Sequence, residues 1–227
     1  MGYDLKPVIV QGGKKHDPRI PDPLPQLPIC MSIVAPRMSG KSSMVCGLIK
    51  EVYRKVFDTV ILASPSVHFD PTFKELTKFK NVGFIDRVDN ETLQDILKKQ
   101  EEIVKEDPSA TLLLYVDDAG DFFRRSSAQK MMNVLYTRAR HSGTSLISCV
   151  QSPQHLSSIQ KTNTTQWIVF RCDKRSMASL AEQLETKHSF AEEVYDYLMD
   201  ATEKRYSFAY LNFQESMKES IYRYGFA

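Results

Sequence analysis

The sequence of 227 residues has few cysteines, little net charge and no long apolar run. Its four cysteines lie far apart without a CxxC pair, which favours buried reduced thiols over a zinc site or a disulfide framework. No apolar stretch reaches the length of about 18 residues that spans a bilayer. The N-terminus also lacks a basic segment followed by an apolar one, the pattern of a secretory signal. We therefore expect a protein without a membrane segment, in a reducing compartment.

The charge balance excludes a histone-like polycation. Lysine and arginine number 30 and acidic residues 28, which gives a net charge of +2. A nucleic-acid partner stays open, because a local basic strip is sufficient to bind phosphates. With 42% hydrophobic and 26% charged residues, the composition is that of a globular domain. The chain is long enough to bury a core without disulfides.

The first 28 residues differ in composition from the rest of the chain. They hold six of the eleven prolines, and the alternating Pro21, Pro23 and Pro25 favour an extended path that excludes helix. We predict an N-terminal arm over residues 1–28 that lies on the domain or on a neighbour, a core over 29–212 and a C-terminal tail over 213–227. Aromatic and basic residues at 222–224 suggest that this tail docks onto a partner or a neighbouring subunit.

Strand-like and helix-like segments alternate along the core. Apolar runs predict strands at 29–35, 59–63, 81–85, 111–116, 145–150, 166–172 and 206–211. Helical spacing of apolar residues predicts helices at 41–56, 90–105, 127–137, 175–184 and 190–202. The run at 111–116 is so apolar that both of its faces must be covered, as in a parallel sheet. The sequence therefore predicts an α/β fold with a doubly wound, mostly parallel sheet flanked by helices.

A phosphate-binding loop is the sharpest motif. Residues 35–42 read Ala-Pro-Arg-Met-Ser-Gly-Lys-Ser and differ from GxxxxGK[ST] only at Ala35. The backbone N–H groups of such a loop cradle phosphates, Lys41 reaches the β and γ phosphates, and the Ser42 hydroxyl binds Mg²⁺. An ordinary strand–turn–helix is the alternative, but the placement between an apolar strand and an amphipathic helix favours a P-loop NTPase. The predicted ATP-binding residues are Pro36, Arg37, Met38, Ser39, Gly40, Lys41, Ser42 and Ser43.

Two carboxylates follow the most apolar strand. Asp117 and Asp118 come directly after Val116, and ligands of open α/β sheets bind at the carboxyl ends of strands. We expect Asp117 to hold Mg²⁺ and Asp118 to polarise the attacking water. Alternatively, Asp118 only caps the turn that follows. A kinase is a weaker hypothesis, because no basic lid segment is evident.

Arginines and a glutamine flank the next strand. Arg138 and Arg140 end a helix and cannot share one helix face, so one of them could enter the active site of a neighbouring subunit. Neutralisation of the helix C-terminus is the alternative for each. Gln151 ends the strand at 145–150, where it would lie beside the γ-phosphate and sense hydrolysis.

The order Arg138, Arg140, Gly143, Ile147, Gln151 resembles the FtsK–HerA lineage of DNA-pumping ATPases, as does the arginine-bearing strand that ends at 171. Within it, the loop and the Asp-Asp pair are similar to genome-packaging ATPases of large double-stranded DNA viruses and virophages, the poxvirus-type group. The resemblance covers roughly residues 29–212. It departs from the pattern at Ala35 and Asp118, where a glycine and often a glutamate stand.

The resemblance implies a homo-oligomeric ring, pentameric or hexameric, that drives double-stranded DNA into a capsid with ATP and Mg²⁺. Arg140 is the first choice for the arginine supplied in trans, and Arg138 the second. The resemblance also implies capsid or portal-like partners and a location in the host cytoplasm, in a viral factory, or in the virion. Phosphate contacts without base readout suit this function. The candidate DNA contacts are Arg124, Arg125, Lys174 and Arg175, with Lys14 and Lys15 on the arm.

Two other functions stay open at this stage. A helicase loader or transposition-type ATPase is also small and forms rings. A nucleotide-gated assembly protein, which binds ATP and hardly hydrolyses it, would suit the arm and the tail. Each makes a different prediction for ATP turnover with long duplex DNA.

Overall fold

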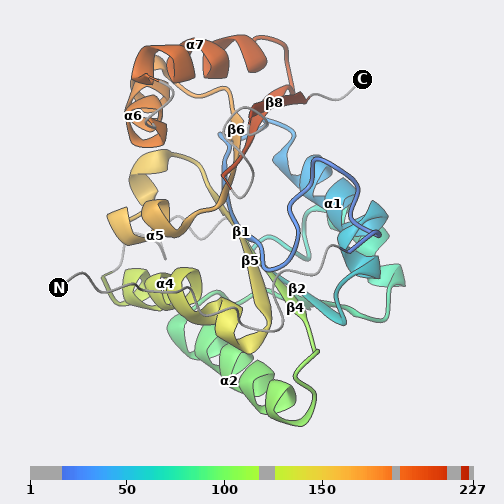
Figure 1. Ribbon diagram of the computed structural model, residues 1–227. Coiled ribbons are helices and arrows are strands. Elements are labelled where there is room, and N and C mark those ends of the chain that lie inside the picture. Colours follow the sequence, from blue (N-terminus) through green and yellow to red (C-terminus); the bar gives the residue numbers. More distant parts are fainter. Residues whose placement is uncertain (1–16, 118–125, 186–189, 214–220, 225–227) are drawn as a thin grey trace, which may run out of the picture.

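The computed structural model describes residues 17–117, 126–185, 190–213 and 221–224 of the chain. One sheet of eight strands runs through the described part, in the order β3-β2-β4-β5-β1-β6-β7-β8 (Figure 1). The six strands from β3 to β6 are parallel, and β7 and β8 are antiparallel at one edge. The prediction of a doubly wound, mostly parallel sheet is confirmed. The strands are β1 (Cys30–Val34), β2 (Thr59–Ala63), β3 (Val82–Ile85), β4 (Leu112–Val116), β5 (Thr144–Val150), β6 (Gln166–Phe170), β7 (Phe208–Asn212) and β8 (Ile221–Tyr224).

Helices cover both faces of the sheet, with α1 on one side and α2, α4, α6 and α7 on the other (Figure 1). The alternation along β4 explains the two layers: Leu112, Leu114 and Val116 face one core, while Leu113 and Tyr115 face the other. The α-helices are α1 (Lys41–Glu51), α2 (Asn90–Glu106), α4 (Ser126–Arg138), α5 (Ser158–Asn163), α6 (Lys174–Leu184) and α7 (Ala191–Ala201). The described residues also form four short 3-10 helices: η1 (Tyr53–Lys55), η2 (Pro71–Lys78), η3 (Ala139–Ser142) and η4 (Pro153–His155).

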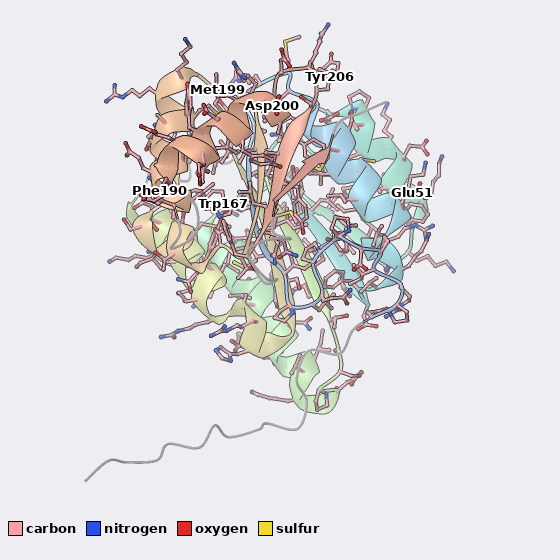
Figure 2. The ribbon with its side chains drawn as sticks, turned by 45° about the horizontal axis from the view of Figure 1, so that its top comes forward. Glu51, Trp167, Phe190, Met199, Asp200 and Tyr206 are labelled. Carbon is pink, nitrogen blue, oxygen red and sulfur yellow. The ribbon has the colours of Figure 1, made fainter. Side chains whose placement is uncertain are left out.

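The core lies on both sides of the central strands. Trp167 of β6 is only 1% exposed and lies under the helices, whereas Phe190, at the start of α7, is 72% exposed (Figure 2). The four cysteines are free thiols; Cys46 and Cys149 are buried, as predicted, whereas Cys30 and Cys172 are only partly buried. Burial raises the pKa of Cys30 and of Cys172 to about 12, so both stay protonated at neutral pH. Within the described ranges, no helix is both long and apolar enough to cross a membrane.

Several element boundaries differ from the sequence-based ones. The helix predicted at 41–56 ends at Glu51, and the chain then turns so that Tyr53 of η1 is fully buried. The short elements η2, α5 and β8 carry too little periodic signal to be found from sequence. Strand β8 lies inside the predicted tail and pairs with β7, so part of that tail belongs to the sheet.

The described part of the predicted arm, residues 17–28, packs against the domain. Ile20 is buried in the same core as α1, and the Arg19 guanidinium donates to the Lys55 carbonyl oxygen at 2.6 Å. The Tyr210 hydroxyl of β7 donates to the Pro23 carbonyl oxygen at 3.1 Å. Residues 17–28 therefore lie on the domain itself, which is one of the two positions expected for the arm.

Candidate nucleotide-binding site

The carboxyl ends of β1, β4 and β5 lie side by side and bring together residues that are far apart in the sequence. A cavity of about 400 Å³ opens there. All eight predicted loop residues, from Pro36 to Ser43, line it, together with Asp117 after β4 and Gln151 after β5. Parallel strands require this convergence, because their carboxyl ends share one edge of the sheet.

The loop has the backbone geometry of an anion cradle. Gly40, directly before α1, has a φ of 90°, a left-handed conformation that glycine adopts without steric cost. Among the described residues, no side chain caps this helix end, so the first N–H groups of α1 are available to a phosphate. Met38 is also left-handed, with a φ of 61°, and the residue is 89% exposed. A non-glycine residue in this region stores strain of about 1–3 kcal/mol, as functional loops often do.

Lys41 and Asp117 form an ion pair across the floor of the cavity, with 2.5 Å between Nζ and Oδ1. The Asp117 side chain is 3% exposed and that of Lys41 17%. Burial, followed by the charge of Asp117, raises the pKa of the Tyr115 hydroxyl and the Cys149 thiol. Both groups therefore stay protonated beside the carboxylate, which Lys41 neutralises.

Three residues that the sequence analysis missed also line the cavity: Ser66, Asp70 and Thr72, from the segment that follows β2. Asp70 caps η2 by accepting a hydrogen bond from the Thr72 N–H at 2.9 Å. Burial opposes ionisation of Asp70, but hydrogen bonds from Thr72 and Ser42 and the charge of Lys41 keep its pKa below the usual value. An aspartate followed by Pro71 signals a helix cap. The contact with Ser42, in contrast, depends on how η2 packs against α1.

The residues at the cavity fit a nucleotide with Mg²⁺. The buried Ser39 hydroxyl finds no hydrogen-bond partner among the described residues, although it lies in the loop that would surround a phosphate. Ser42, Asp117 and Asp70 contribute hydroxyl and carboxylate oxygens, the hard ligands that Mg²⁺ prefers. Lys41 would hold phosphate oxygens, and Ser42 and Asp117 would hold the metal.

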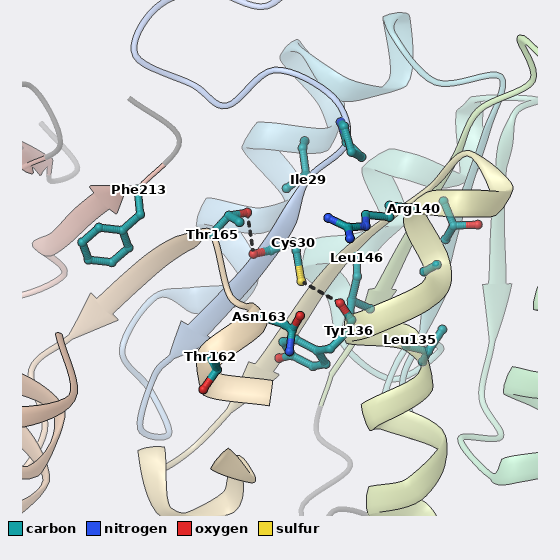
Figure 3. Close-up of a pocket in the computed structure, with 13 residues that line it drawn as sticks. Ile29, Cys30, Leu135, Tyr136, Arg140, Leu146, Thr162, Asn163, Thr165 and Phe213 are labelled. Carbon is teal, nitrogen blue, oxygen red and sulfur yellow. Dashed lines mark hydrogen bonds between the residues drawn. The ribbon is translucent and has the colours of Figure 1, made fainter. Parts of the chain in front are cut away.

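The two arginines proposed for a neighbour's site lie at the other edge of the sheet. Arg138 ends α4 and Arg140 lies in η3, just before the amino end of β5, and both are exposed. Arg140 lines a second cavity, of about 420 Å³, beside Cys30 and Tyr136 (Figure 3). The phosphate loop lies at the carboxyl ends of the parallel strands, so neither arginine belongs to the cavity around Lys41.

The remaining predicted residues fall into two groups. Asp118, Arg124 and Arg125, like Lys14 and Lys15, lie outside the described residues. Lys174 and Arg175 form the exposed first turn of α6, which follows the carboxyl end of β6. Because β6 pairs in parallel with β1, these two cations lie at the edge of the sheet that carries the phosphate loop.

Comparison with protein families shows which family the chain belongs to. The family described as Poxvirus A32 protein matches residues 22–211, which cover most of the core and the last part of the predicted arm. The chain belongs to the Poxvirus A32 protein family. The resemblance to poxvirus-type packaging ATPases is thus confirmed, as is the prediction of a P-loop ATPase.

Solved structures agree on the fold of this Poxvirus A32 family member. B204, the DNA-packaging ATPase from Sulfolobus Turreted Icosahedral Virus, aligns with a TM-score of 0.62 at 16% identity, covering 87% of this chain and 97% of B204. The genome packaging NTPase B204 from Sulfolobus turreted icosahedral virus 2, in complex with AMPPCP, aligns with a TM-score of 0.61 at 16% identity and coverages of 88% and 98%.

A bacterial ATPase shares the same fold. The cytoplasmic domain of the Thermomonospora curvata Type VII Secretion ATPase EccC aligns with a TM-score of 0.61 at 14% identity, covering 88% of this chain and 25% of EccC. Among curated proteins, none matches the sequence of this family member. At these identities the solved structures establish a P-loop NTPase fold.

Proposed function

We propose that the protein is an ATP-driven double-stranded DNA translocase that packages a viral genome into a capsid as a homo-oligomeric ring. One observation carries the ring: the cavity around Lys41 and the exposed Arg140 lie at opposite edges of one sheet. An arginine that serves a nucleotide must then serve that of the next subunit. Such a head-to-tail contact between identical chains closes into a ring, here of five or six subunits. Arg138 is the second choice for this role.

Each residue of the cavity has its own role in ATP hydrolysis. Lys41 exchanges its contact with Asp117 for the β and γ phosphates, while Ser42 and Asp117 hold Mg²⁺. The metal, when bound, neutralises charge on the phosphates. Asp118 polarises the attacking water, and Gln151, which lines the cavity at the end of β5, hydrogen-bonds to that water or to the γ-phosphate.

DNA would be held by phosphate contacts along the rim of this edge. Lys174 and Arg175 lie in the first turn of α6, where the helix dipole disfavours positive charge, and neither forms an ion pair with a described residue. A DNA phosphate would stabilise both positive charges. Arg124 and Arg125 are further candidates. The net charge of +2 suits a motor, because a protein that displaced many counterions would bind the DNA too tightly to move along it.

The proposed partners follow from the same function. Capsid or portal-like viral proteins would receive the DNA, and the host cytoplasm, in a viral factory, or the virion would be the location. The similar B204 proteins are described as packaging enzymes of viruses, which supports this proposal.

A phosphate-release assay with and without long duplex DNA tests the function. We expect duplex DNA to stimulate turnover more than single-stranded DNA does. Stimulation by single strands alone would indicate a helicase loader or transposition-type ATPase, and negligible turnover in all conditions would indicate a nucleotide-gated assembly protein.

The ring is tested by subunit mixing. The variant Arg140→Ala should bind ATP normally yet lose about 10³-fold or more in turnover, as when a trans arginine is removed. Mixing it with Lys41→Ala subunits, which bind no nucleotide, should restore part of the activity. The same experiment with Arg138→Ala shows whether the second arginine plays this role instead. Normal turnover of the Arg140→Ala variant would remove Arg140 from it.

A further inference from the structure

Asp70 brings a carboxylate to the nucleotide cavity from a part of the chain that carries no nucleotide-binding motif. It lies on the segment between β2 and η2 and lines the cavity together with Asp117. Ser42 and Lys41 of the phosphate loop line the same cavity, and both lower the pKa of the Asp70 carboxylate. Two residues of the phosphate loop therefore interact with Asp70 in addition to the helix cap at Thr72.

The segment that carries Asp70 is held firmly against α1. Phe73 and Leu76 of η2 are buried in the core that α1 shares. The Cys46 thiol of α1 donates to the Thr72 carbonyl oxygen at 3.3 Å. Before Asp70, the backbone folds into consecutive turns, in which the N–H of Asp70 donates to the Ser66 carbonyl oxygen at 2.9 Å. The position of Asp70 relative to Ser42 is therefore set by packing.

We propose that Asp70 is a positioning residue for the magnesium ion of the nucleotide complex, because it orients the Ser42 hydroxyl. This inference rests on the proposed ATPase function. A hydroxyl has one O–H to donate and two lone pairs. When the O–H of Ser42 points to Asp70, the lone pairs are left for a cation that Asp117 also binds. Mutation of a group that orients a metal ligand in this way typically costs about 10–100-fold in metal affinity or activity.

The variant Asp70→Ala removes the acceptor, and Asp70→Asn removes the charge while keeping a good helix cap. Binding of a fluorescent ADP is measured while Mg²⁺ is varied, and again in EDTA. We expect the Mg²⁺ concentration for half-maximal enhancement of binding to rise about tenfold in Asp70→Asn and further in Asp70→Ala. Affinity for ADP in EDTA should stay within about twofold of the wild type, because the loop itself is intact. A Mn²⁺ titration followed by electron paramagnetic resonance should show the same weakening.

Asp89 offers a matched control. It caps α2 by accepting a hydrogen bond from the Thr92 N–H at 2.8 Å, as Asp70 does for η2, but it does not line the cavity. Asp89→Asn should leave the Mg²⁺ dependence unchanged. If Asp70→Asn and Asp70→Ala behave like Asp89→Asn while the wild type shows Mg²⁺-enhanced binding, the role of Asp70 is refuted and the proposed function stands. If the wild type binds no nucleotide, the proposed function fails and the inference fails with it.

Discussion

Removal of the Lys41 ammonium group tests whether the floor of the cavity is an electrostatic pair that nucleotide binding rearranges. The variant Lys41→Met keeps most of the length of the side chain and deletes its charge. Asp117 then loses the positive charge beside its carboxylate, and its side chain is only 3% exposed. Removing one partner of a buried ion pair costs about 3–5 kcal/mol. The cavity admits solvent to Lys41, so we expect about 2 kcal/mol here, or a fall in Tm of about 4–8 °C for a chain of this length.

A double-mutant cycle isolates the pair from other effects of the substitution. Asp117→Asn in the Lys41→Met background replaces the buried carboxylate with a neutral amide, so most of the lost stability should return. The expected coupling free energy between the two sites is about 1–2 kcal/mol. Thermal unfolding followed by circular dichroism measures stability, and a fluorescent ADP measures binding in parallel.

The two readouts must separate for the reasoning to hold. The double variant should regain stability and still fail to bind nucleotide, because a neutral amide at position 117 cannot replace the cation that Lys41 provides. If the changes in the free energy of unfolding of the two single variants, relative to the wild type, add to the change of the double variant within about 0.5 kcal/mol, the ion pair contributes nothing and the argument is refuted.

Two further changes test the arginine-bearing turn and the candidate DNA contacts. Gly143→Ala should destabilise the chain by about 2–3 kcal/mol, because Gly143 has a φ of 64° and an added Cβ would clash with the Ala110 carbonyl oxygen; an unchanged Tm would contradict this. Lys174→Ala combined with Arg175→Ala should lower the slope of log Kobs against log salt for duplex DNA by about 0.9 for each lost phosphate contact. Lys98→Ala on the exposed face of α2 serves as the control, and an equal effect there would show only a change in overall charge.

Sequence patterns alone are sufficient for much of the fold and for the centre of the site. The period of apolar residues distinguishes strands from helices locally, so each predicted strand and helix of the core has a counterpart in the structure. The spacing around Gly40 and Lys41 specifies a phosphate loop wherever it follows a strand. Asp117 and Gln151 end parallel strands, and this topology places them at the edge of the sheet where the loop lies.

The tertiary structure decided what depends on contacts between distant segments. The approach of Asp70 to Ser42 arises because η2 packs on α1, and no local pattern encodes that packing. The opposite placement of Arg140 and the phosphate loop follows from the parallel pairing of β5 with β1, because Arg140 precedes the amino end of β5 and the loop follows the carboxyl end of β1. The burial of Ile20 and the pairing of β8 with β7 likewise depend on tertiary contacts, because these two segments are too short to show periodicity. The spacing of side chains along the sequence determines the local secondary structure, whereas the packing of the whole core determines which distant segments become neighbours.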